Sequence, residues 1–210
     1  MIQISDSALS DCDELITTFE KLSAKAPIWA LVHDSDFSQT VVLGDVTLSE
    51  EHSIRLASVS NLVLGRIYAA LLEKGQLSPA AAVYEFYKKY QHRLSDLRVD
   101  DLARHNTGLR DALESKSFRD KINEDVTAHV SIDEIIYRSL IQDLVQDRPN
   151  YKNINAILLA GVLEQVTGRA LKELIAHHLP NVPGLHFDTK GGIPKPYPVG
   201  YRFGSAPGFI

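Results

Sequence analysis

The sequence predicts an α+β fold that is mostly helical and has a short antiparallel hairpin near its N-terminus. Apolar residues recur at spacings of three and four through most of the chain, which is the period of an amphipathic helix. Two short β-type runs, 28–32 and 40–43, flank a turn cluster and predict the hairpin. With 210 residues, of which 44% are hydrophobic, the chain is long enough to bury a core.

The helices are expected in order along the chain. Residues 5–24 have an amphipathic pattern. A helix from Ser58 should end near Gly75, which stands where a C-terminal cap belongs. This helix is expected to be the most buried one, because apolar residues extend around most of its circumference. Pro79 is expected to open a further helix at its first turn. The remaining helices are expected at 97–104, 131–146, 153–166 and 170–178.

The composition changes toward the C-terminus. From residue 180 onward, the chain holds half of its 12 glycines and most of its 9 prolines. This composition does not continue helices and gives isolated edge strands at most. We therefore predict a single domain over residues 1–189 and a Pro/Gly-rich tail over residues 190–210.

Charge and composition exclude several classes of function. The chain has 22 Lys+Arg against 27 Asp+Glu and lacks a long basic run, so nucleic acid is not an expected partner. The single cysteine, Cys12, excludes a cysteine-rich zinc site, and we expect no metal and no cofactor. The longest apolar stretch, 154–163, is about half as long as a membrane span. The first 20 residues lack an early basic cluster. We expect a cytoplasmic protein with no membrane partner.

Three segments, in order, resemble the serine β-lactamase and penicillin-binding-protein superfamily, specifically its class C and esterase-like branch. Residues 54–61 read IRLASVSN, similar to the family's (F/I)RxASxxK motif. Residues 101–109 read DLARHNTGL and look like its LLxHTSGL segment. Residues 150–168 begin NYKNINAILL, end in TG and look like YSNxNYxLLGxIIExxTG. The resemblance covers about residues 28–189 and implies a β-lactamase/transpeptidase-like helical domain with a reduced sheet.

The resemblance implies a serine acyl-transfer site. In the family, the serine of the first motif is the nucleophile, and a lysine one turn later takes its proton. The tyrosine of the third motif is a second proton carrier, and its asparagine binds the acyl side chain of the substrate. The matching candidates for catalysis are Ser58 and Tyr151. The candidates for substrate binding are Asn61, which stands at the lysine position, and Asn153.

Two features depart from the family's pattern. Asn61 replaces the lysine, and an amide is not a base near neutral pH. The chain also stops soon after Thr189, where family members continue, so we expect a C-terminally truncated member that lacks strands of the sheet. The hairpin edge that is then left free is expected to be covered by the 190–210 tail, by a second copy or by a different partner chain, and a homodimer is the preferred expectation.

Three functions stay open at this point. The first is a serine hydrolase or acyltransferase that acts on an ester, amide or thioester with altered catalytic machinery. The second is a non-catalytic relative that serves as a binding or assembly subunit. The third is a repurposed enzyme whose cleft carries out different chemistry. Each candidate residue also has a structural interpretation. Ser58 or Asn153 caps a helix, Asn61 fills the space of the lysine, and Tyr151 packs against a loop.

Overall fold

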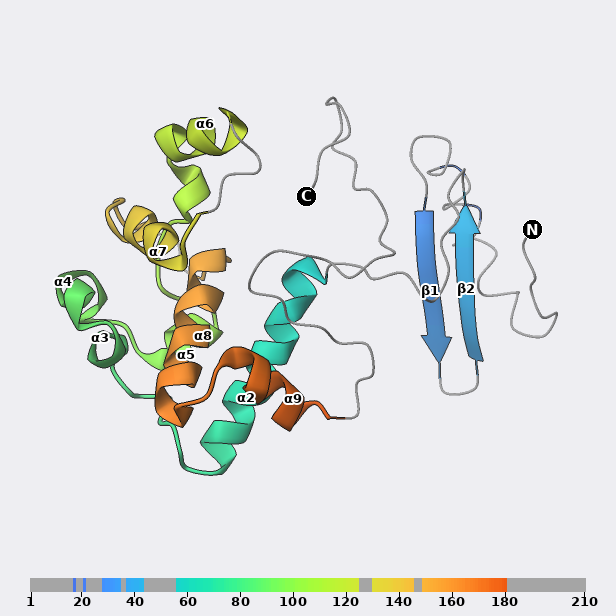
Figure 1. Ribbon diagram of the computed structural model, residues 1–210, viewed down its shortest axis with the longest axis horizontal. Helices are drawn as coiled ribbons and strands as arrows, with labels where there is room; N and C mark the ends of the chain where they lie inside the picture. Colours follow the sequence, from blue (N-terminus) through green and yellow to red (C-terminus); the bar gives the residue numbers. More distant parts are fainter. Residues whose placement is uncertain are drawn as a thin grey trace. The chain divides into compact units, whose positions relative to one another are not determined.

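The computed structural model describes residues 17, 21, 28–34, 37–43, 56–124, 130–145 and 149–180. The chain divides into two units: residues 1–55 with 193–210, and residues 56–192 (Figure 1). Apart from residues 17 and 21, the helix predicted over 5–24 lies outside the described residues, as does the tail at 190–210.

The described part of the first unit is an antiparallel pair of strands. β1 (Ile28–Asp34) pairs with β2 (Phe37–Leu43), so that Ile28 lies opposite Leu43 and Asp34 lies opposite Phe37. Each strand extends beyond its predicted run on the side of the connection. Only two residues separate the strands, a length that joins neighbouring antiparallel strands directly.

The second unit is built from helices, and it confirms the prediction of a mostly helical protein. Within the described ranges, no helix is long and apolar enough to cross a membrane. The α-helices are α2 (Ser60–Glu73), α3 (Val83–Phe86), α4 (Gln91–Leu94), α5 (Val99–Ala103), α6 (Lys116–Glu124), α7 (Ile132–Leu140), α8 (Asn153–Thr167) and α9 (Leu171–His178). Short 3-10 turns are η1 (Ala57–Val59), η2 (Lys88–Tyr90) and η3 (Ala112–Glu114).

Helix α8 is the centre of this unit. It packs against α2, α3, α5, α7 and α9, and Figure 1 shows α2 and α9 to one side of it and α3 and α7 to the other. Gly168 ends the helix with a φ of 65°, the left-handed cap that glycine adopts without strain. The buried residues of α8 are Ile154, Asn155, Leu158, Leu159, Val162 and Leu163.

The prediction that the helix after Ser58 is the most buried is wrong for the described part of the chain. α2 buries Ile67, Tyr68, Ala70 and Leu71, which all lie in its C-terminal half. In its N-terminal half, Leu62 is 73% exposed. The described helices cover only one half of α2, whereas they surround α8 along most of its length.

The helix predicted to open at Pro79 begins later, at Val83. The N–H of Val83 donates to the carbonyl of Leu97 at 3.0 Å, and the N–H of Val99 donates to the carbonyl of Ala81 at 3.0 Å. This short strand-like pairing holds the segment extended, and a helix that started at Pro79 would have to break it.

Candidate active site

Asn61 and Tyr151 meet, although 90 residues separate them in the sequence. Asn61 lies in the first turn of α2, and Tyr151 lies just before α8. The Nδ2 amide of Asn61 donates a hydrogen bond to the Tyr151 hydroxyl oxygen at 2.8 Å. Since the oxygen accepts this bond, the hydroxyl proton of Tyr151 is free to be donated elsewhere. Tyr151 is 49% exposed, so the pair lies at the surface of the helical unit.

Ser58 lies in η1, one turn before Asn61. It is exposed, and its hydroxyl makes no hydrogen bond to another described residue. Residues three apart share a helix face, which places Ser58 and Asn61 on the same side of the start of α2. The capping interpretation of Ser58 is wrong, because the cap position of α2 is Val59 and has no side-chain hydrogen bond.

The backbone next to Ser58 is strained. Ala57 has a φ of 47°, a left-handed conformation that costs an L-residue about 1–2 kcal/mol. Among the non-glycine residues that the structure describes, only Ala57 and His105 have a positive φ. Both adjoin the candidate site, since Ala57 precedes Ser58 and His105 packs on Tyr151. Strain of this kind is often concentrated at functional sites.

The ring of His105 packs against the ring of Tyr151. The two ring centroids lie 4.5 Å apart, with an angle of 33° between the planes. The Nδ1 atom of His105 lies 3.3 Å from the backbone nitrogen of Lys152 and 3.2 Å from the Nδ2 amide of Asn155. His105 therefore holds Tyr151 in place. Its own ring is bonded to the peptide that follows Tyr151 and to Asn155 of α8.

Asn153 makes no hydrogen bond to Asn61 or Tyr151 in the described structure and is bonded to Asp111 instead. Its side-chain nitrogen and its backbone N–H both donate to Oδ2 of Asp111, at 3.2 Å and 3.1 Å. The N–H of Ile154 donates to Oδ1 of Asp111 at 2.8 Å. Asp111 thus caps α8, and its negative charge also suits the positive end of the helix dipole. This cap was not predictable from local sequence patterns, because 42 residues separate Asp111 from Asn153.

The positive charge nearest to Tyr151 in the sequence is engaged elsewhere. Lys152 Nζ lies 2.7 Å from Oε1 of Glu114. Burial raises the pKa of Glu114, but hydrogen bonds from the Lys152 ammonium and the Asp111 backbone outweigh it and hold the pKa below its usual range. Lys152 thus directs its charge to Glu114 and not to the pair of Asn61 and Tyr151.

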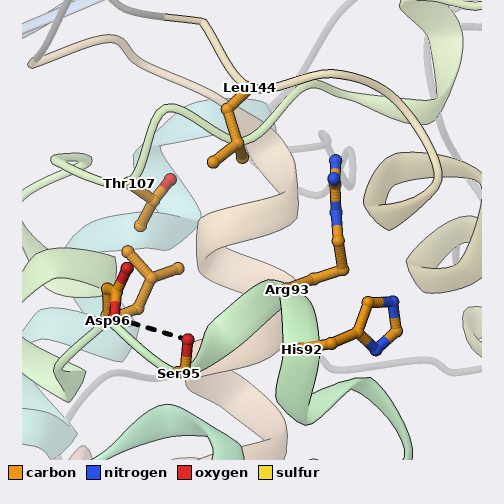
Figure 2. A pocket seen from close by; sticks show the side chains of 7 residues that line it. His92, Arg93, Ser95, Asp96, Thr107 and Leu144 are labelled. Carbon is orange, nitrogen blue, oxygen red and sulfur yellow. Dashed lines mark hydrogen bonds between the residues drawn. The ribbon is translucent and has the colours of Figure 1, made fainter.

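A hollow of about 100 Å³ lies elsewhere in the helical unit (Figure 2). Ser95 donates to Asp96 at 3.4 Å, and the Arg93 guanidinium donates to the carbonyl of Gln142, so part of its polar lining is bonded within the protein. Ser58, Asn61, Tyr151 and Asn153 do not line it, and it is therefore not the predicted site. In the described part of the chain, no three His, Cys, Asp or Glu side chains group as metal ligands would.

Comparison with known proteins agrees with the fold and with the motifs. The sequence profile of the Beta-lactamase family matches residues 30–189, which is most of the chain. The protein belongs to this family. A separate comparison with curated proteins gives no match.

Solved structures share the fold at low sequence identity. A D-stereospecific amidohydrolase from Streptomyces sp. is 18% identical with a TM-score of 0.65, over 73% of this chain and 48% of its own. The D-amino acid amidase from Ochrobactrum anthropi SV3 complexed with D-phenylalanine is 17% identical with a TM-score of 0.62, over 80% and 49%. The octameric penicillin-binding protein homologue from Pyrococcus abyssi is 18% identical with a TM-score of 0.63, over 80% and 42%. The chain spans about half the length of these structures.

Proposed function

We propose that the protein carries out serine acyl transfer with an uncharged proton carrier. The hydrogen bond between Asn61 and Tyr151 is the observation that supports this proposal. Asn61 stands at the family's lysine position, and Tyr151 stands at the position of the family's tyrosine. The bond keeps these two positions in contact, although the positive charge of the lysine is absent. The proposed substrate is a small molecule with an ester, amide or thioester carbonyl.

The proposed step needs no charged base. The Ser58 Oγ attacks the carbonyl carbon and forms the acyl-oxygen bond. The serine proton moves to the hydroxyl oxygen of Tyr151 while the phenol proton moves to the leaving group, whose bond to the carbonyl carbon then breaks. Tyr151 ends as it began, and no net charge is created on it. Attack by water or another acceptor on the acyl-serine ester releases the acyl group and restores Ser58.

Asn61 and Asn153 are proposed to contact the substrate. Asn61 positions Tyr151 with one amide hydrogen and has a second for a substrate oxygen. Asn153 uses its amide nitrogen on Asp111, and its amide oxygen is proposed as an acceptor for the acyl part. D-phenylalanine amide is the first substrate to test, because D-amino acid amidases are among the structures that share the fold.

Intact-protein mass spectrometry after incubation with a fluorophosphonate and with a penicillin tests the proposal. We expect an adduct on Ser58 that is absent in Ser58→Ala. Asn61→Lys restores the family's base and should speed the labelling if the rest of the site is complete. A folded protein that gives no adduct, with or without Asn61→Lys, would contradict the proposal.

A second function is favoured by the amide at position 61. Loss of the base from a nucleophile–base pair costs several orders of magnitude in rate, so the site would then bind a carbonyl ligand without reacting. Thermal stabilisation by D-phenylalanine amide that requires Tyr151, together with the absence of any adduct, would support this binding function in place of catalysis.

We also propose that the protein is a homodimer. The described strands form a sheet of β1 and β2 alone, and a two-stranded hairpin is only marginally stable in water. A second copy that pairs along this hairpin would satisfy the backbone groups that have no partner among the described strands. Multi-angle light scattering at micromolar concentration should give twice the chain mass of 23.3 kDa. A monomer under these conditions would contradict the dimer.

A further inference from the structure

We infer that Thr107 and Asn155, two buried polar residues, are positioning residues for Tyr151. They act through His105, because they help to fix which of its ring nitrogens carries the proton. The link to catalysis rests on the proposed function, whereas the link to the histidine tautomer does not.

The buried hydrogen bonds have one consistent direction. Thr107 and Asn155 are both 0% exposed. The N–H of Leu109 donates to the Thr107 hydroxyl oxygen at 3.1 Å. The Thr107 hydroxyl donates its own proton to Oδ1 of Asn155 at 2.7 Å. With its oxygen toward Thr107, the Asn155 amide presents its Nδ2 hydrogens to Nδ1 of His105, 3.2 Å away.

A second donor meets the same ring nitrogen. The backbone N–H of Lys152 lies 3.3 Å from Nδ1 of His105 and can only donate. Two N–H groups therefore point at Nδ1, and this atom must accept. A neutral histidine carries one ring proton, so in His105 the proton is on Nε2. If Asn155 turned its oxygen toward His105 instead, Nδ1 would face one donor and one acceptor, and the tautomer would no longer be determined.

His105 in turn fixes the peptide that carries Tyr151. The carbonyl of His105 accepts the N–H of Asn150 at 2.9 Å, and its ring accepts the N–H of Lys152. Both neighbours of Tyr151 are thus bonded to one residue, and the Tyr151 ring rests on the imidazole. The positive φ of His105, 55°, allows the backbone and the ring to reach these groups together. Histidine is one of the few residue types that are enriched in this conformation.

Long-range ¹H–¹⁵N NMR of the full-length protein tests the tautomer. At about pH 8, above the ordinary pKa of histidine, we expect the Nε2–H tautomer for His105, with Nδ1 in the range of an unprotonated ring nitrogen. The His105→Asn variant, which suits the left-handed backbone, assigns the signal by its loss. A wild-type spectrum in which Nδ1 carries the proton would overturn the inference without any variant.

Two substitutions at one buried position test the role of Thr107. Thr107→Ser keeps the hydroxyl and should keep the wild-type tautomer. Thr107→Val is close in shape but cannot donate to Asn155, so a share of His105 should move to the Nδ1–H form. An unchanged tautomer in folded Thr107→Val would contradict the role of Thr107. If Thr107→Val does not fold, Asn155→Asp is the replacement, since its carboxylate is an acceptor and should place a proton on Nδ1.

The same variants connect the tautomer to Tyr151. We expect Thr107→Val to slow fluorophosphonate labelling of Ser58 about tenfold relative to Thr107→Ser. Equal labelling rates in the two variants, with different tautomers, would overturn the positioning of Tyr151. If the wild type shows no labelling, the proposed function fails, and the tautomer and the nuclear Overhauser contacts between the His105 and Tyr151 rings still decide the structural inference.

Discussion

The two helix starts that form the candidate site are built differently. The start of α8, next to Tyr151, is held by the Asp111 cap and by His105, and the helix behind it is buried along its length. The start of α2, next to Ser58, has no side-chain cap, a strained Ala57 and an exposed Leu62. A site built this way takes its tyrosine from a firmly packed element and its serine from a segment with fewer constraints in the described structure.

The largest expected difference between the two helices is in their apolar packing. Leu158 of α8 is 0% exposed, and Leu158→Ala should lower the free energy of unfolding by about 3 kcal/mol through lost burial and a cavity. Leu62→Ala in α2 is the matched control and should change it by less than about 0.5 kcal/mol. Urea unfolding measures both. Similar losses in the two variants would show that α2 is covered as fully as α8.

Glycine positions give the next contrast. The Tyr87 hydroxyl donates to the carbonyl of Leu158 at 2.9 Å, and a Cβ at residue 161 would overlap this hydroxyl. Gly161→Ala should therefore destabilise the protein by about 1–3 kcal/mol. At Gly65 of α2, no described atom lies within 4 Å of the added methyl group, so Gly65→Ala should stabilise the helix by up to about 1 kcal/mol.

A double variant sharpens this contrast. Tyr87→Phe removes the hydroxyl that the new methyl group would meet, so combining it with Gly161→Ala should cost less than the sum of the two single changes. Strict additivity in thermal or urea unfolding would show that Tyr87 does not lie over Gly161.

The Asp111 cap should have a smaller effect. Asp111→Ala removes the acceptor for the N–H groups of Asn153 and Ile154 and should cost about 1–2 kcal/mol. In α2, Ser60→Ala removes only a hydroxyl bond to the carbonyl of Ala57, and its cost should be below about 0.5 kcal/mol. Hydrogen exchange localises each effect, and equal exchange at both helix starts would contradict the difference described above.

The ion pair next to Tyr151 should have the smallest effect, and this effect should depend on pH. The pKa of Glu114 is lower in the folded protein than in the unfolded chain, so its contribution is full above the unfolded pKa. The contribution is lost as the pH falls through the lower, folded pKa. Glu114→Gln should thus cost less than about 1 kcal/mol near pH 7 and nothing in strong acid. If the stability cost of Glu114→Gln did not change with pH, the ionised carboxylate of Glu114 would not be the group that stabilises the fold.

The sequence predicted the parts of the fold that depend on local patterns. Helices α8 and α9 lie close to their predicted ranges, and Gly75, the glycine expected to end the helix after Ser58, has a φ of 64°. The burial of α2 was not predictable, because an apolar pattern does not say which neighbours cover each half of a helix. The predicted helix start at Pro79 was wrong because the backbone of Val83 pairs with the backbone of Leu97, which local periodicity does not reveal.

Part of the candidate site was also within reach of the sequence. Asn155 is a polar residue inside the apolar run 154–163, and a buried amide requires hydrogen-bond partners. Its bond to Thr107 joins two of the three segments that carry the family resemblance. The Asp111 cap and the pairing of Lys152 with Glu114 depend on tertiary structure alone, since their partners are distant in the sequence.

Asn61 and Tyr151 are proposed to act as one unit on Ser58. The rate of fluorophosphonate labelling in the wild type, Asn61→Ala, Tyr151→Phe and the double variant tests this proposal most directly. We expect Tyr151→Phe to slow labelling by roughly 100-fold, and the double variant to be no slower than Tyr151→Phe alone, because residues of one unit are not additive. A double variant that is slowed by the product of the two single effects, or labelling that is indifferent to Tyr151, would contradict the account.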